Sequence, residues 1–97
     1  MLLNKLLVEY LGTTLLMFVI FLTGNYLAIG AALSLAVFLG GSISGGAFNP
    51  AVAISLYVSG KLSKYDLIPY IIAQILGGLT AFGVYSNFFT HFRFYTF

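Results

Sequence analysis

Apolar residues form three long runs along the chain, separated by short stretches that are rich in glycine and polar residues. The runs predict helices over residues 4–23, 27–40 and 67–85. About 20 apolar residues are enough to cross a bilayer core about 30 Å thick, so each run is a candidate transmembrane helix, with the second the shortest. The polar break from Gly24 to Tyr26 indicates a tight hairpin between the first two helices. The pattern predicts an all-α membrane protein.

A fourth helix, too short to span a bilayer, is predicted after a glycine-rich segment. Residues 40–46 contain four glycines. Each glycine inside a helix costs about 1 kcal/mol relative to alanine, so we expect the backbone to leave helical geometry there. Asn49 is a favoured N-cap residue and Pro50 is favoured at the first helical position. The apolar residues that follow predict a helix over 50–59, which reaches only about 13 to 15 Å. This element is a re-entrant half-helix.

Composition agrees with a multi-pass integral membrane protein and excludes several other classes. Of the 97 residues, 61% are hydrophobic and only 6% are charged, too few to cover a soluble domain. There is no cysteine, which excludes disulfides and thiolate sites. The net charge of +2 is dispersed, so we expect no nucleic-acid partner. The single histidine, His91, lies near no second ligand or nucleophile, so we predict no metal site, no cofactor and no catalytic residues.

The basic residues predict the orientation of the chain in the membrane. Lys5, Lys61 and Lys64 flank one side of the predicted helices, and Arg93 flanks the other. Because basic residues are enriched in cytoplasmic segments, this bias places the N-terminus in the cytoplasm. Residues 86–97 are rich in aromatic side chains and are expected to form an interfacial belt.

The glycine-rich approach to the half-helix indicates a functional site. Irregular backbone at membrane depth is tolerated only where it is packed in protein or lines a watery cavity, because unpaired amides in hydrocarbon cost several kcal/mol. We therefore predict a pore or binding site near the midplane. The positive end of the half-helix dipole and the Asn49 amide would face it, repelling cations and orienting water. The alternative role for Asn49 is a simple helix cap.

Three motifs, in order along the chain, resemble one known family. Residues 44–52 read SGGAFNPAV, residues 9–13 read EYLGT and residues 70–78 read YIIAQILGG. They resemble the first pore loop, first helix and third helix of the aquaporin and glycerol-facilitator family, the major intrinsic proteins. The resemblance implies three transmembrane helices plus one re-entrant half-helix, equivalent to a single aquaporin repeat. A complete family pore has two such repeats, and this sequence supplies one.

The resemblance also implies roles for individual residues. Asn49 would donate its amide to the solute, and Pro50 and Ala51 would hold the half-helix at the centre. Phe48 and Ile29 would border the pore, Ile29 standing where water-selective members often have a constricting phenylalanine. The residues that would support the loop are Glu9, Gln74, Ser44, Gly45 and Gly46.

Alternatives remain for several of these roles. Glu9 is either a structural acceptor or a boundary residue whose side chain reaches the lipid headgroups. Gln74 is either a support or a solute contact. Ala73, Gly77 and Ala81 recur every four residues, a spacing that lets helices approach closely within the chain or between subunits. Ala47 departs from the family pattern, since many members have histidine at this position. Val52 follows the motif as in the family's first pore loop, whereas arginine follows the motif in the second loop.

The leading functional hypothesis is a passive channel for water or small neutral solutes such as glycerol. It would need a second repeat, supplied by homo-oligomerisation or by another half-repeat, and an inverted dimer would bring two Asn49 turns together. The alternatives are a non-conducting truncated repeat or accessory membrane subunit, and a small protein that permeabilises membranes indiscriminately. An enzyme is the least favoured class.

Overall fold

The structure is a computed structural model that describes residues 1–92. Helices make up nearly all of this part of the chain. The elements are α1 (Leu2–Thr23), α2 (Tyr26–Ser44), α3 (Pro50–Val58), α4 (Lys64–Phe88) and a 3-10 helix η1 (Thr90–Phe92). The predicted fold class is confirmed: α1, α2 and α4 are long and apolar enough to cross a membrane, and α3 has nine residues.

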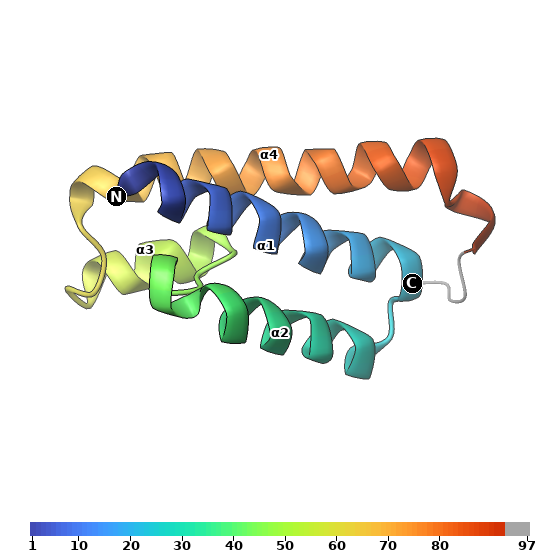
Figure 1. Ribbon diagram of the computed structural model, residues 1–97, viewed down its shortest axis with the longest axis horizontal. Coiled ribbons are helices and arrows are strands. Elements are labelled where there is room, and N and C mark those ends of the chain that lie inside the picture. Colours follow the sequence, from blue (N-terminus) through green and yellow to red (C-terminus); the bar gives the residue numbers. More distant parts are fainter. Residues whose placement is uncertain (93–97) are drawn as a thin grey trace.

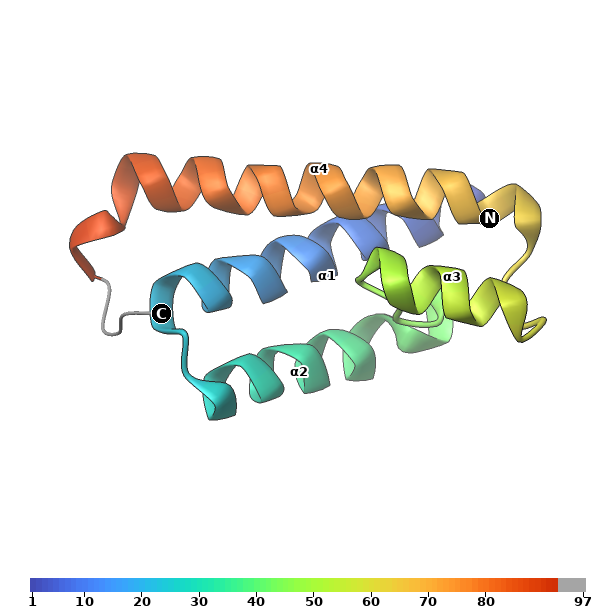
Figure 2. The ribbon, with the colours of Figure 1, turned by 180° about the vertical axis from the view of Figure 1, so that it is seen from behind.

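The helices form an open bundle in which α1 is central. Helices α1 and α4 lie side by side and run in the same direction, whereas α2 returns antiparallel to α1 (Figure 1). Helix α3 lies in the half of the molecule that holds the beginning of α1, and it packs against α4 (Figure 2). A core of Ala47, Ala53, Leu62 and Tyr70 joins the loop before α3 to the start of α4. One half of the bundle is therefore filled by α3.

Helix α2 is longer than the predicted 27–40 because the first two glycines of the 40–46 segment remain helical. Asn25 caps its start, its Oδ1 accepting hydrogen bonds from Leu27 N at 2.9 Å and Ala28 N at 3.0 Å. Gly40 faces α1, where an added Cβ would overlap the Val8 side chain. Close helix packing thus offsets the low helix propensity of glycine. The helix ends at Gly45, whose φ of 88° is readily adopted only by glycine.

Helix α4 also extends beyond the predicted 67–85 at both ends. The Ser63 side chain caps its start by accepting a hydrogen bond from Tyr65 N at 3.1 Å. Pro69 therefore lies inside the helix, whereas the predicted start at residue 67 would put it in the first turn. The proline ring has no N–H, so the carbonyl of Tyr65, four residues earlier, lacks its helical donor, which is tolerable close to the polar end of the helix.

Small residues allow α1 and α4 to pack closely. Ala73 and Ala81 are buried, and a Cβ added at Gly77 would lie 2.7 Å from the carbonyl oxygen of Tyr10 in α1. Nearby, the Tyr10 hydroxyl and Thr80 Oγ1 form a hydrogen bond of 2.7 Å. The small-residue spacing in α4 therefore serves packing within the chain.

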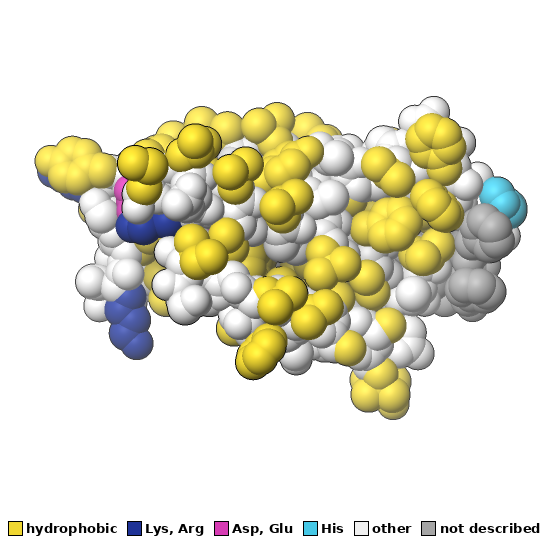
Figure 3. All heavy atoms as spheres, in the orientation of Figure 1, with side chains coloured by type: hydrophobic (Ala, Val, Ile, Leu, Met, Phe, Trp, Pro, Cys, Tyr) yellow, Lys and Arg dark blue, Asp and Glu magenta, His cyan; other side chains and the backbone are white. Residues whose placement is uncertain are grey.

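The outer surface is apolar along the helices and charged at one end. Leu11, Phe38 and Leu79 are more than half exposed, as expected for side chains that face lipid. Lysine side chains gather at one end of the molecule and the histidine lies at the other (Figure 3). At the lysine end, Lys5 Nζ lies 3.3 Å from Asp66 Oδ2, joining the starts of α1 and α4. Arg93, the one basic residue that the prediction placed on the opposite side, lies outside the described residues.

Candidate pore site

Asn49 caps the inner end of the half-helix. Its Oδ1 accepts a hydrogen bond of 2.7 Å from Ala51 N, and Pro50 occupies the first helical position. The cap fixes the amide plane, which leaves Nδ2 directed away from the helix. Within residues 1–92 no acceptor binds this Nδ2, and the Asn49 residue is exposed. Asn49 therefore caps the N-terminus of α3 through Oδ1 and presents a free donor, Nδ2, at the same point.

A buried carboxylate holds the loop before Asn49. Glu9 in α1 has no exposed surface. Its Oε1 accepts hydrogen bonds from Phe48 N and Gln74 Nε2, both at 2.8 Å. Its Oε2 accepts from Ser44 Oγ at 2.7 Å and Ala47 N at 3.1 Å. Four donors suit a carboxylate that only accepts, so the structure brings Glu9, Gln74 and the loop together as one network.

The glycines of the loop turn the chain around this carboxylate. Gly45 and Gly46 have φ values of 88° and 67°, in the left-handed region that favours glycine. Ser44 Oγ also accepts a hydrogen bond of 3.1 Å from Gly46 N, which closes the turn. Two consecutive residues with positive φ reverse the chain, so that it leaves α2 and re-enters the bundle at α3.

Two polar residues that the sequence analysis did not assign to the site also hold the loop. The Tyr70 hydroxyl donates to the Ser44 carbonyl oxygen at 2.7 Å, and Thr13 Oγ1 donates to the Phe48 carbonyl oxygen at 3.2 Å. Both side chains are buried. Thr13 lies in the motif at residues 9–13 and Tyr70 in the motif at residues 70–78. Nothing in either motif distinguishes a residue that holds the loop from one that only packs between helices.

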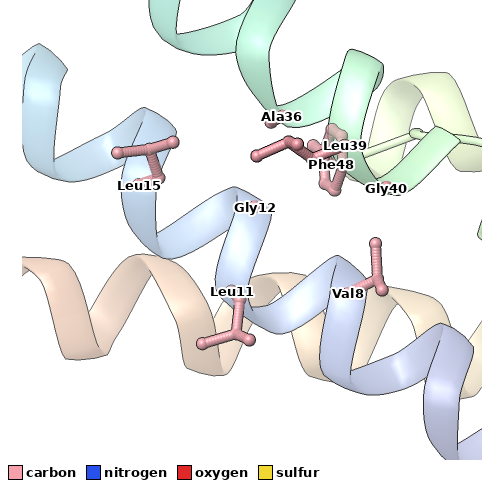
Figure 4. Close-up of a pocket in the computed structure, with 8 residues that line it drawn as sticks. All are labelled: Val8, Leu11, Gly12, Leu15, Ala36, Leu39, Gly40 and Phe48. Carbon is pink, nitrogen blue, oxygen red and sulfur yellow. The ribbon is translucent and has the colours of Figure 1, made fainter.

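The Phe48 side chain packs inside the protein. Phe48 has a φ of 56°, rare for a residue with a side chain, and is 2% exposed. Its ring lies against Gly12, where an added Cβ would overlap it. Phe48, Gly12 and Gly40 border a small apolar hollow of about 240 Å³ between α1 and α2 (Figure 4). The ring thus wedges the loop between two helices.

A larger groove lies at the N-terminus of α3, and we call it the Asn49 groove. It has a volume of about 470 Å³ and lies between α1 and α4, bordered at one end by Asn49 and Pro50. Its polar side chains are Thr13, Asn49 and Gln74. The rest is apolar, and includes Leu16, Met17, Ile20, Phe21, Ile75 and Leu79. Phe48 also borders this groove, whereas Ile29, near the start of α2, does not. A polar end and an apolar wall are typical of sites that orient a small solute.

Gln74 differs from the other buried polar residues of the site. It is 2% exposed, and its Nε2 is used by Glu9. Among the described residues, its Oε1 is the one buried side-chain nitrogen or oxygen atom without a hydrogen-bond partner. An acceptor left unpaired in apolar surroundings costs free energy. The residues that border the Asn49 groove therefore include a free donor at Asn49 and a buried, unpaired acceptor at Gln74.

Comparisons with known proteins give a consistent result. The model of the family described as Major intrinsic protein matches residues 1–95. The chain is 40% identical over 94 residues to Glycerol uptake facilitator protein-like 6 of Lactiplantibacillus plantarum, covering 88% of this chain and 44% of that protein. It is 39% identical over 97 residues to Aquaporin Z of Photorhabdus laumondii, covering 84% and 42%.

The Propanediol uptake facilitator PduF of Salmonella typhimurium is 46% identical over 68 residues, covering 66% of this chain and 26% of that protein. The chain thus spans less than half the length of these relatives. No solved structure matches significantly.

Proposed function

Because the chain belongs to the major intrinsic protein family, we propose that it forms one half of a passive membrane channel for water or small neutral solutes such as glycerol. The observation that carries the proposal is the position of Asn49. Helix α3 has nine residues, which reach about 13 Å and so bring the cap from the membrane surface to near the midplane. An amide donor left unpaired in hydrocarbon would cost free energy, whereas a polar solute that passes through a pore would accept its hydrogen bond.

The electrostatics of the turn favour neutral solutes. The N-terminus of α3 carries the positive end of the helix dipole, and its first backbone N–H groups lack helical partners. Of the described residues, the one carboxylate near this turn, Glu9, is already held by four donors. A cation at Asn49 would thus meet a positive end with no free counter-charge, whereas the oxygen of a water molecule or an alcohol would be bound favourably.

Completion of the pore requires a second repeat. The Asn49 groove is bordered by α1 and α4, and within this chain a single half-helix enters it from one side. We propose that a second copy of the chain or another half-repeat covers the groove and places its own turn opposite Asn49. The positive-inside bias supports a cytoplasmic N-terminus for this chain, and a second copy that faces it would have the inverted orientation. Glu9, Gln74, Ser44, Gly45 and Gly46 then act as supports that hold the turn, and Ile29 lines the pore farther from it.

Solute flux into vesicles tests this function. Wild-type protein is reconstituted into proteoliposomes, and swelling or shrinkage is followed by stopped flow with water and glycerol gradients. We expect permeability above the lipid background and no leak of an entrapped anionic dye. Asn49→Asp keeps the capping oxygen but replaces the donor with a negative charge, so its flux should fall towards background.

The matched control is Asn25→Asp. Asn25 also caps a helix through Oδ1 but lies at the hairpin between α1 and α2, away from the groove. It should keep wild-type flux. Equal flux through both variants would show that Asn49 does not line the pore. Background permeability in the wild type would reject the channel and favour a non-conducting accessory subunit, and dye leakage would indicate an indiscriminate lesion.

A further inference from the structure

The unpaired oxygen of Gln74 belongs to a side chain that borders the Asn49 groove. Nε2 donates to Glu9 Oε1 at 2.8 Å, so the two ends of the amide are not interchangeable. Turning the amide over would place Oε1 against a carboxylate oxygen, and two acceptors repel each other. Glu9 therefore holds Gln74 Oε1 on the side of the amide away from the carboxylate, without a donor among the described residues.

We propose that Gln74 Oε1 accepts a hydrogen bond from a water molecule or solute hydroxyl held beside Asn49, making Gln74 a positioning residue for the solute. This inference rests on the proposed channel function. Asn49 Nδ2 offers a donor and Gln74 Oε1 an acceptor, and both residues border the same groove. Water and alcohols can use both at once, because a hydroxyl group donates one hydrogen bond and accepts others.

The burial of Gln74 Oε1 decides the kind of donor. The atom has less than 1 Å² of exposed surface, so its donor must enter the wall of the groove. A single water molecule or hydroxyl needs only a small local opening, whereas a helix or loop of a partner would need a larger displacement of α1 from α4. The tight contact at Gly77, where a Cβ would lie 2.7 Å from the Tyr10 carbonyl oxygen, resists such a displacement.

The composition of the chain allows a direct test. Gln74 is its single glutamine and Glu9 its single glutamate. Cell-free synthesis with ¹³Cδ-labelled glutamine and glutamate therefore gives one signal from each residue. In hydrated bilayers, water-edited solid-state NMR measures how fast polarisation passes from water protons to each Cδ.

Glu9 serves as the internal reference, because it is fully buried and its four donors all come from the protein. We expect rapid transfer to Gln74 Cδ and little transfer to Glu9 Cδ. Transfer to Gln74 as slow as that to Glu9 would overturn the proposal. So would a contact between labelled Gln74 and a ¹⁵N–H group of a second copy in a mixed sample, because the donor would then be protein.

Flux through substituted channels gives a second readout. Gln74→Met keeps the approximate shape of the side chain but removes the acceptor, together with the donor to Glu9. Loss of the acceptor alone should lower water permeability about 2- to 10-fold, the range for one uncharged hydrogen bond, so we expect a fall of at least this size. The control, Thr80→Val, loses the α1–α4 hydrogen bond to Tyr10 but does not border the groove, and should keep wild-type flux. Unchanged flux in folded Gln74→Met would also overturn the proposal.

The failures of the two proposals are distinguishable. Water at Gln74 together with background flux in the wild type would reject the channel but keep the solute contact. Wild-type flux with no water at Gln74 would keep the channel and reject the contact. If Gln74→Met does not fold, the NMR measurement on the wild-type chain still decides.

Discussion

Glu9 Oε1 accepts a hydrogen bond of 2.8 Å from Phe48 N, which joins the first membrane helix to the backbone one residue before Asn49. The two residues are separated by 39 positions. The bond ties a carboxylate in α1 to the loop that positions the cap of α3. The depth and direction of the Asn49 turn therefore depend on α1, although α3 itself packs mainly against α4.

Glu9→Gln should destabilise the fold strongly. Hydrogen bonds to charged groups contribute about 1.5 to 3 kcal/mol each, and the amide would replace one accepting oxygen by an NH₂ group facing donors. We expect a loss of at least about 3 kcal/mol in the free energy of unfolding, measured by denaturant titration in detergent.

The control for Glu9 is Asp66→Asn, the other acidic residue of the chain. Asp66 forms a partly exposed ion pair with Lys5 at 3.3 Å, and such pairs contribute less than about 1 kcal/mol. If both substitutions cost the same, the network around Glu9 does not hold the loop.

Gly12→Ala should force the Phe48 ring out of its position. The added Cβ overlaps the ring, and overpacking of this kind costs about 1 to 3 kcal/mol. Gly83→Ala in α4 meets nothing within 4 Å and should be neutral or stabilising by up to about 1 kcal/mol, since alanine favours helix. Thermal unfolding of both variants in the same detergent checks the difference. An equally stable Gly12→Ala would contradict the wedge position of Phe48.

Tyr70→Phe should loosen the junction between α2 and the loop. The substitution removes the hydroxyl that donates to the Ser44 carbonyl oxygen, and the loss of this hydrogen bond should lower the free energy of unfolding by about 1 to 3 kcal/mol. Tyr57→Phe, in the exposed face of α3, is the matched control and should change stability by less than about 0.5 kcal/mol. Amide hydrogen exchange at Gly46 and Ala47 should accelerate in Tyr70→Phe only.

The predicted orientation can be tested because the chain has no cysteine of its own. A cysteine replacing Gly60, next to Lys61 at the lysine end, should react with an impermeant maleimide from the cytoplasmic side. No atom lies within 4 Å of a Cβ added at Gly60, so the cysteine has room, although the φ of 84° is strained for any residue other than glycine. Asn25→Cys at the opposite end is a second position, expected to label from the other side. Labelling of each position from one side only excludes an inverted homodimer, in which both sides would react.

The membrane location, the three spans and the capped half-helix can all be predicted from the sequence. These features depend on local properties: the length of each apolar run, the preference of Asn49 for an N-cap and that of Pro50 for the first helical turn. The glycine-rich segment was also identified, but the predicted helix ended at residue 40, whereas residues 40–44 remain helical. Local propensity disfavours glycine in a helix, and the close approach of Gly40 to Val8 in α1 is a tertiary contact that offsets it.

Tertiary structure decided how the loop is held and which atoms remain free. Besides bordering the Asn49 groove, Phe48 fills with its ring the space that Gly12 leaves open 36 positions earlier, a long-range fit that no local pattern specifies. Similarly, the motifs indicated Glu9 and Gln74 as supports, but not that Glu9 would use one end of the Gln74 amide and leave the other unpaired. That division depends on the distance between α1 and α4, and it is the tertiary packing that sets this distance.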